Sequence, residues 1–178
     1  MFPGAMRVAA CLALAIVSAV AGAELPDLGA AAPFRLTTQD GAPLALEDLR
    51  GKVVLLAFIY ASCKDVCLTG IARMVQVQEG LGADFGRRVR FLSITIDPGH
   101  DTAAVLKRYA RQSGARLDGW SFLTGSPETV RQVARDYGVA FRKSASGVEH
   151  NTLASIIDGQ GHLRVQYMGV AFDPGEML

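Results

Sequence analysis

The chain has 178 residues, of which half are hydrophobic and a fifth are charged, with 18 basic and 17 acidic side chains. This near balance of charge argues against nucleic acid or an anionic membrane surface as a partner, because both are bound through clustered positive charge. The length suits one domain with a hydrophobic core of its own. No internal repeat or low-complexity linker divides the sequence further.

The N-terminus has the pattern of a secretory signal peptide. One basic residue, Arg7, precedes an apolar run over residues 8–20, and the small residues 21–23 suit a cleavage site. The run is short for a membrane span, which takes about 20 residues, although an uncleaved anchor is a second interpretation. We therefore predict a signal peptide or anchor over residues 1–23. One exported domain follows over residues 24–178, with 17 basic and 17 acidic residues.

The domain is predicted to begin with a short strand over residues 33–38 and a short helix or turn over residues 44–50. Residues 53–60 form a continuous apolar run, of the kind that is buried on both faces of a parallel sheet. A helix is predicted to follow from about Asp65. Its apolar residues at helical spacing are Leu68, Ile71, Ala72 and Val75.

A second strand and helix are predicted next. Residues 89–96 form another apolar run, and Asp101 or Thr102 can cap the helix that follows it. A short strand over residues 120–123 comes after this helix. The residues that the helix is expected to turn inward are Val105, Leu106 and Tyr109.

The third helix has the clearest start in the sequence. Ser126 suits the N-cap and Pro127 the first helical position, and Gly138 marks the end. A polar loop over residues 142–149 follows, which we expect to be mobile. The residues predicted to be buried by this helix are Val130, Val133, Ala134 and Tyr137.

The chain is predicted to close with a β-hairpin, whose strands over residues 152–157 and 162–168 are joined by the turn at residues 158–161. Residues 173–176 resemble a further helix start, so the sequence ends in a short tail or lacks a last helix. Strands alternating with helices, followed by a hairpin, predict an α/β fold. Its mixed central sheet is flanked by helices on both faces.

Cys63 and Cys67 are the two cysteines outside the predicted leader, which contains Cys11. They follow the apolar run 53–60, at the junction of a strand, a short loop and a helix. A helix N-terminus lowers the pKa of a nearby thiol and so favours the thiolate. Cysteines four residues apart on a helix share a face, so the pair suits a disulfide or a two-sulfur metal site, but not both at once. An inert buried pair, or one structural disulfide, is the alternative interpretation.

Several motifs stand in a characteristic order: Gly51–Phe58, the C-x-x-x-C pair, Ser93–Thr102, Leu123–Pro127, Tyr137–Val139 and His150. Together they resemble the Sco/SenC family of thioredoxin-fold copper-binding proteins. The resemblance implies a thioredoxin-like domain that binds copper, as Cu(I), Cu(II) or both, through Cys63, Cys67 and His150. It also implies a location in the periplasm or at the outer face of the inner membrane.

The resemblance further implies a role in assembling the copper centre of cytochrome c oxidase, by delivering copper, by reducing cysteines of the target, or by both. The expected partner is the copper-accepting oxidase subunit or another exported copper protein, with a thiol reductant as a second partner. The sequence departs from the family pattern at Lys64 and Leu68, where proline usually follows each cysteine. Asn151 replaces the serine that commonly follows the histidine.

The other residues with metal-binding side chains receive structural interpretations. His100 and His162 are interpreted as surface residues, and Asp97 as the first residue of an Asp-Pro turn. Met74 and Met168 could be soft ligands, but their helical and strand spacing favours packing in the core.

An exported thiol–disulfide oxidoreductase using Cys63 and Cys67 is the competing function, and the one reading in which the chain is an enzyme. Enzymes of the thioredoxin type normally carry C-x-x-C and a proline before the late strand, where residues 147–150 contain none. A peroxidase of the peroxiredoxin type would place threonine where Tyr60 stands. A redox signal carrier that binds a partner without chemistry is a third class.

Overall fold

The computed structural model describes residues 25–63, 66–144, 147–170 and 172–178, and only the backbone of residues 66–67, 143–144 and 147. The α-helices are α1 (Val66–Gly80), α2 (Ala103–Gln112) and α3 (Pro127–Asp136). The 3₁₀ helices are η1 (Leu46–Leu49), η2 (Gly82–Asp84) and η3 (Pro174–Met177). The strands are β1 (Arg35–Thr38), β2 (Pro43–Ala45), β3 (Val53–Ile59), β4 (Val89–Thr95), β5 (Trp120–Thr124), β6 (Phe141–Ser144), β7 (Gly147–His150), β8 (Leu153–Ile157) and β9 (Leu163–Met168).

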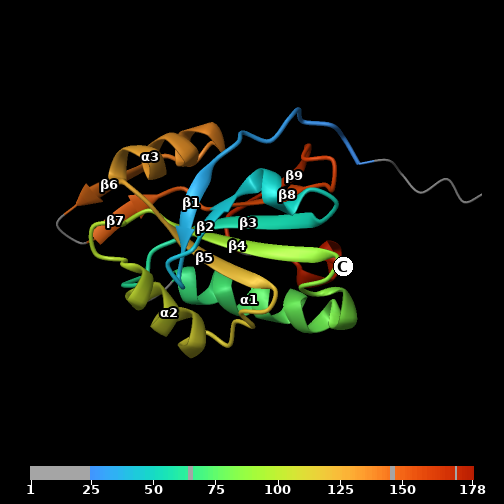
Figure 1. The fold of residues 1–178 in the computed structure, drawn as a ribbon, viewed down its shortest axis with the longest axis horizontal. Helices are drawn as coiled ribbons and strands as arrows, with labels where there is room; N and C mark the ends of the chain where they lie inside the picture. The colour runs from blue at the N-terminus through green and yellow to red at the C-terminus, as the bar shows by residue number, and fades with distance from the viewer. Residues whose placement is uncertain (1–24, 64–65, 145–146, 171) are drawn as a thin grey trace, which may run out of the picture.

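The centre of the molecule is a seven-stranded mixed sheet in the order β2-β1-β5-β4-β3-β8-β9 (Figure 1). β3 pairs in parallel with β4 and antiparallel with β8, and β4 pairs in parallel with β5. Both β3 and β4 are long apolar runs, and their inner residues are buried on both faces. The predicted α/β fold with a mixed sheet flanked by helices is therefore confirmed.

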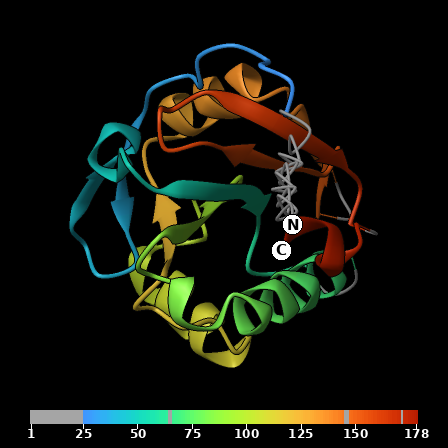
Figure 2. The same ribbon diagram turned by 90° about the vertical axis from the view of Figure 1, so that its right-hand side faces the viewer.

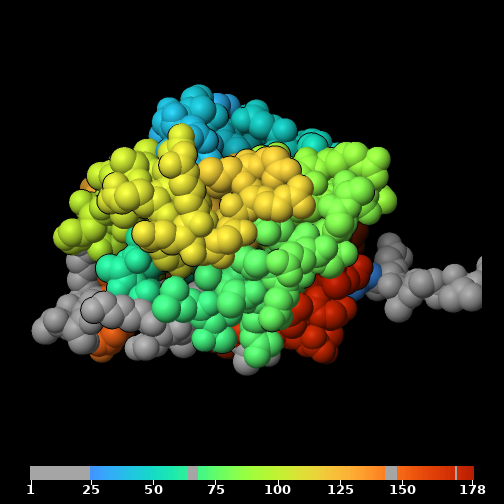
Figure 3. Space-filling model, turned by 90° about the horizontal axis from the view of Figure 1, so that it is seen from below, coloured from blue at the N-terminus to red at the C-terminus, as the bar shows by residue number. Residues whose placement is uncertain are grey.

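The helices form two layers, one on each face of the sheet (Figure 2). On one face, α3 and η1 pack Val130, Ala134 and Leu49 against the sheet. On the other, α1 and α2 contribute Ile71 and Leu106 to a second apolar cluster. A space-filling view of this second face shows α1 and α2 covering the sheet (Figure 3).

Local signals in the sequence set most helix boundaries. Ser126 accepts a hydrogen bond from the backbone N–H of Thr129 at 3.1 Å, and Pro127 is the first residue of α3, as predicted. Gly138 follows α3 with a φ of 77°, a conformation that favours glycine. For α2, Thr102 is the N-cap and accepts from the N–H of Val105. The alternative cap, Asp101, was the wrong choice.

Residues 142–149 were predicted to be a mobile polar loop. The described residues of this segment lie in two strands, so the loop assignment is wrong, while the mobility stays a prediction. β6 and β7 pair as an antiparallel hairpin in which Arg142 lies opposite Glu149. Their side chains form an ion pair at 2.6 Å, and such cross-strand pairs stabilise a hairpin. The polar sequence reflects a hairpin whose faces are partly exposed to water. Its base is fastened by Asn151, whose side chain accepts from Ala140 N–H at 2.7 Å.

Three apolar residues predicted to face inward are exposed instead. In α1 the buried face is formed by Met74 and Val77 together with Ile71, so Leu68 and Ala72 lie on the outer side. The apolar face predicted for this helix is therefore rotated about the helix axis relative to the face that is buried. Met168 is 81% exposed because it ends β9, a strand at the edge of the sheet. The burial predicted for Met74 is confirmed.

Two further elements differ from the sequence-based expectation. Strand β2 was not predicted, and the helix start at Asp173 leads only into the short helix η3.

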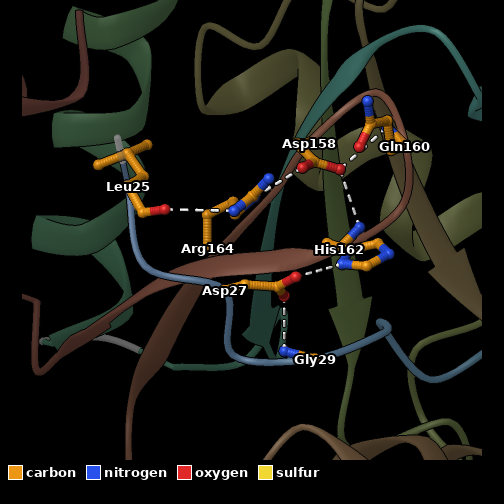
Figure 4. A network of polar contacts seen from close by, with 7 residues as sticks. All are labelled: Leu25, Asp27, Gly29, Asp158, Gln160, His162 and Arg164. Carbon is orange, nitrogen blue, oxygen red and sulfur yellow. Dashed lines mark hydrogen bonds and ion pairs between the residues drawn. The ribbon is translucent and has the colours of Figure 1, made fainter. Parts of the chain in front are cut away.

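Residues 25–30 run beside β9, at the edge of the sheet. Leu28 N–H donates to Leu163 O, and Leu163 N–H donates to Gly29 O, each at 2.9 Å. Asp27 Oδ2 lies 2.7 Å from His162 Nδ1, and Arg164 pairs with Asp158 at 2.6 Å. We call the residues of Figure 4 the Asp27 network: Leu25, Asp27, Gly29, Asp158, Gln160, His162 and Arg164.

The leader predicted over residues 1–23 and its Cys11 lie outside the described residues. Within the described part of the chain, no helix combines the length and apolar character needed to cross a membrane.

Candidate metal centre

Cys63 lies just beyond the carboxyl end of β3, in a turn over residues 60–63 that we call the thiol turn. The last sheet hydrogen bond before this turn runs from Ile96 N–H to Ile59 O at 2.8 Å, and Cys63 N–H then donates to Tyr60 O at 3.2 Å. Cys63 is buried, with 7% of its surface exposed. The predicted order of strand, short turn and helix is present, since α1 begins at Val66.

Cys67 is the second residue of α1, but its side chain lies outside the description. The distance between the two sulfurs, and hence the choice between disulfide and metal site, stays a prediction. Among the side chains that are described, no group of three or more His, Cys, Asp or Glu is placed to hold a metal ion. The Cys67 sulfur is not among these side chains, so the predicted set of three ligands stays a prediction.

His150 is brought to the thiol turn by the pairing of two strands. β8 runs antiparallel to β3, with Ala57 opposite Ala154, so the residues just before β8 lie beside those just after β3. His150 ends β7, three residues before β8 begins, and its ring meets the Tyr60 ring edge-on with 5.8 Å between centroids. The hairpin β6–β7 lies at the end of the sheet where α1 begins (Figure 1).

One hydrogen bond fixes the proton on the His150 ring. Nδ1 lies 2.9 Å from the carbonyl oxygen of Asn151. A carbonyl oxygen only accepts hydrogen bonds, so Nδ1 carries a proton, and in the neutral imidazole the lone pair is then on Nε2. A neutral imidazole oriented through its second nitrogen is the form that binds metals. The half-buried His150 ring therefore has a nitrogen suited to a metal, next to the turn that carries Cys63.

Asp97, His100 and His162 have the structural roles that were predicted for them. Asp97 O accepts the N–H groups of His100 and Asp101, at 3.0 and 2.9 Å, so Asp97 begins a turn. His100 is a surface residue with a 75% exposed side chain, and its Nδ1 lies 2.8 Å from Asp97 Oδ2. His162 is on the surface within the Asp27 network (Figure 4). It follows the end of β8 that pairs with Val54, at the start of β3, whereas the thiol turn follows the other end of β3.

Asp101 is a residue of the site that sequence reasoning missed. It was considered only as a helix cap, yet its side chain is buried below the thiol turn and accepts from Ala61 N–H at 2.9 Å. Burial raises the pKa of this carboxyl, although hydrogen bonds from Thr95 and Ala61 oppose the shift, and the negative charge of Asp97 adds to it. The signal in the sequence was the adjacent Thr102, which can cap the helix by itself and leaves Asp101 without that role.

Comparison with known proteins decides the family. The family model described as SCO1/SenC matches residues 23–178, which is most of the chain. The chain belongs to the SCO1/SenC family. A SCO1 protein homolog from Bacillus subtilis is 32% identical over 146 residues, covering 80% of this chain and 75% of that protein. The chain spans only 40% of the mitochondrial SCO2 homolog from Bos taurus.

Solved Sco structures share the fold. ScoI of Arabidopsis thaliana, with copper bound, matches 84% of this chain and 93% of its own with a TM-score of 0.74 and 25% identity. BsSco, described as a member of the Sco family of cytochrome c oxidase assembly proteins with a disulfide switch, matches 86% of this chain and 92% of its own. Its TM-score is 0.75 at 29% identity. The thioredoxin-like architecture expected from the resemblance is thus confirmed.

Proposed function

We propose that this protein is an exported copper chaperone whose ligands are Cys63, Cys67 and His150. The observation that carries the proposal is the position of His150, whose ring lies against Tyr60 at the start of the thiol turn in a chain of the SCO1/SenC family. The related ScoI of Arabidopsis thaliana has been solved with copper bound. Copper is here the cargo of the protein.

The donor set suits copper in both oxidation states. Two thiolates favour Cu(I), and the imidazole nitrogen adds a ligand of the kind that Cu(II) prefers. The thiols and the histidine come from segments far apart in the chain, so copper would join the thiol turn to the hairpin β6–β7. Release then needs only one of these segments to move.

The proposed acceptor is the copper-binding subunit of cytochrome c oxidase, or another exported copper protein. BsSco, described among the cytochrome c oxidase assembly proteins, supports this choice. The leader pattern of residues 1–23 supports export to the periplasm or the outer face of the inner membrane. Delivery of copper and reduction of target cysteines are compatible activities. In the second, the two thiols give up two electrons and two protons to a target disulfide and become a Cys63–Cys67 disulfide.

The test is a competition titration of the reduced protein with Cu(I), together with the copper stoichiometry. We expect one copper per chain, and almost complete loss of binding in Cys63→Ser and in Cys67→Ser, because hydroxyl is a hard and poorly ionised ligand. His162→Ala is the matched control and should keep full affinity. A wild-type protein without tight copper binding, or a loss of Cu(II) affinity in His162→Ala as large as that in His150→Ala, would remove the proposal.

A thiol–disulfide oxidoreductase is the second candidate, favoured by the disulfide switch described for BsSco. The two functions differ in their need for Cys67. A Cys67→Ser variant that kept full copper affinity would contradict the chelate. If the same variant formed mixed disulfides through Cys63 with a model disulfide substrate, Cys63 would be the attacking thiol of an oxidoreductase.

A further inference from the structure

The thiol turn leaves the sheet and must find hydrogen-bond partners elsewhere. The backbone of this segment last bonds to the β4 side of the sheet at Ile59, whose carbonyl oxygen accepts from Ile96 N–H at 2.8 Å. Beyond it, Cys63 N–H bonds within the turn, to Tyr60 O. Ala61 N–H points inward, where a backbone donor without a partner is costly. Its partner comes from a different part of the chain.

That partner is the Asp101 carboxylate, which is only 2% exposed. Asp101 Oδ2 accepts from Ala61 N–H at 2.9 Å and from the Thr95 hydroxyl at 2.5 Å. Thr95 Oγ1 in turn accepts from Asp97 N–H at 3.0 Å, so its own proton is directed to Asp101. The bond from Ala61 and the chain from Asp97 through Thr95 converge on Asp101 Oδ2, so the carboxylate connects the thiol turn to the end of β4.

The alternative roles of Asp101 are excluded by its surroundings. Thr102 caps α2, so Asp101 is not needed there. A buried carboxylate costs free energy unless its hydrogen bonds compensate for the lost water, and an apolar residue at this position would avoid that cost. The side-chain contacts of Asp101 go to the thiol turn and to Thr95, which makes holding the turn its structural contribution.

We propose that Asp101 is a positioning residue of the copper site, which holds Ala61 and thereby sets the place of the Cys63 sulfur. The proposal rests on the copper site proposed above. Side chains that orient metal ligands without touching the metal typically contribute about 10- to 100-fold to metal affinity. Asp101 does this through the backbone, two residues before the ligand.

The experiment compares Asp101→Ala, Asp101→Asn and Gln39→Ala in the full chain. Asp101→Ala removes the acceptor, whereas the amide oxygen of Asn can still accept from Ala61 N–H. Gln39 is the matched control, because it is 5% exposed and accepts from Phe122 N–H at 2.8 Å, in another part of the sheet. The readouts are Cu(I) affinity, the rate at which Cys63 is alkylated in the reduced protein without copper, and hydrogen exchange of the Ala61 amide.

We expect Asp101→Ala to lower Cu(I) affinity about 10- to 100-fold, with changed Cys63 alkylation and faster exchange at Ala61. Asp101→Asn and Gln39→Ala should stay within about twofold of wild type in copper affinity. A folded Asp101→Ala protein with wild-type affinity and alkylation would overturn the proposal, as would an equal loss in Gln39→Ala. If Asp101→Ala does not fold, Asp101→Asn with a loss as large as 10-fold would overturn it, and retained affinity with protected Ala61 exchange would support it. If the wild type binds no copper, the proposed function fails, while the alkylation and exchange rates still decide whether Asp101 positions Cys63.

Discussion

His150 lies beside the thiol turn and His162 belongs to the Asp27 network. The imidazole rings of these two histidines are held by different contacts. His162, in the Asp27 network, lies 2.7 Å from a carboxylate and helps to fasten residues 25–30 to β9 (Figure 4). His150 has an aromatic edge contact with Tyr60 and a bond from Nδ1 to a backbone carbonyl. The first arrangement uses the ring to hold two segments of the chain together. The second orients the ring and leaves Nε2 for another partner.

The carboxylates of the two regions differ as well. Asp27 is on the surface, and the hydrogen bonds from Gly29 N–H and from His162 lower its pKa. Asp101 is buried, and burial raises its pKa. A charged group at the edge of the sheet is therefore favoured by the fold, whereas the charge below the thiol turn is tolerated at a cost. Such a cost is more often found at functional sites than in structural contacts.

The largest expected effect is the loss of copper binding at the thiol turn on oxidation, which the Asp27 network, without a cysteine, does not share. Treating the protein with an oxidant should form the Cys63–Cys67 disulfide and abolish Cu(I) binding, because a sulfur in a disulfide is no longer a thiolate. Reductant should restore binding, and bound copper should slow alkylation of both cysteines. The measurement is copper retained per chain, with free thiols counted by mass spectrometry. Oxidised protein that has no thiols and still binds one copper tightly would place the site elsewhere.

The next effect compares the two histidines directly. His150→Ala should weaken Cu(II) binding by about tenfold or more and Cu(I) binding much less, because two thiolates can hold Cu(I) in low coordination. His162→Ala should change neither affinity. Competition titrations in each oxidation state provide the measurement. Equal losses of Cu(I) and Cu(II) in His150→Ala would argue against this division of roles.

A smaller effect is expected from the aromatic ring that contacts His150. An edge-on aromatic pair contributes about 0.5–1.5 kcal/mol, so Tyr60→Leu should lower Cu(II) affinity about two- to tenfold by releasing the His150 ring. Tyr60→Phe keeps the ring and is the matched control for the loss of the edge contact. The same Cu(II) titration measures both variants. If Tyr60→Leu binds Cu(II) like wild type, the ring contact does not orient His150.

The smallest effects are expected from replacing the two carboxylates, Asp27 and Asp101, which should change the stability of the protein at pH 7 in opposite directions. The lowered pKa of Asp27 means that its contribution is present above its unfolded value of about 3.8 and is lost as pH falls through the folded pKa. Asp27→Asn should therefore lower stability at pH 7 and have no effect in strong acid. The raised pKa of Asp101 has the opposite sign, since the fold favours the protonated acid.

Asp101→Asn should consequently unfold at higher denaturant concentration than wild type at pH 7, and the difference should vanish below about pH 3.8, the unfolded value. Urea unfolding of both variants at several pH values measures these changes. A loss of stability in Asp101→Asn at pH 7 would mean that the negative charge of Asp101 is favoured by its surroundings, as that of Asp27 is.

Local sequence signals determined the long central strands and the start of α3. The apolar run 53–60 gave β3 and the run 89–96 gave β4, because strands buried on both faces need continuous apolar sequence. Ser126 and Pro127 set the start of α3, because the N-cap and first helical position depend on neighbouring residues alone. The Sco/SenC resemblance, carried by short motifs in order, was confirmed for most of the chain.

Tertiary contacts decided what local signals could not. The polar stretch predicted as a loop contributes to the paired strands β6 and β7, because Arg142 and Glu149 pair across them and Asn151 holds Ala140 at their base. Leu68 and Met168 are exposed because burial depends on which surface the rest of the chain covers, and neither position is covered. Asp101 gained its partner from a residue 40 positions away. His150 meets Tyr60 because β8 returns antiparallel to β3, a pairing between segments almost a hundred residues apart that no local pattern specifies.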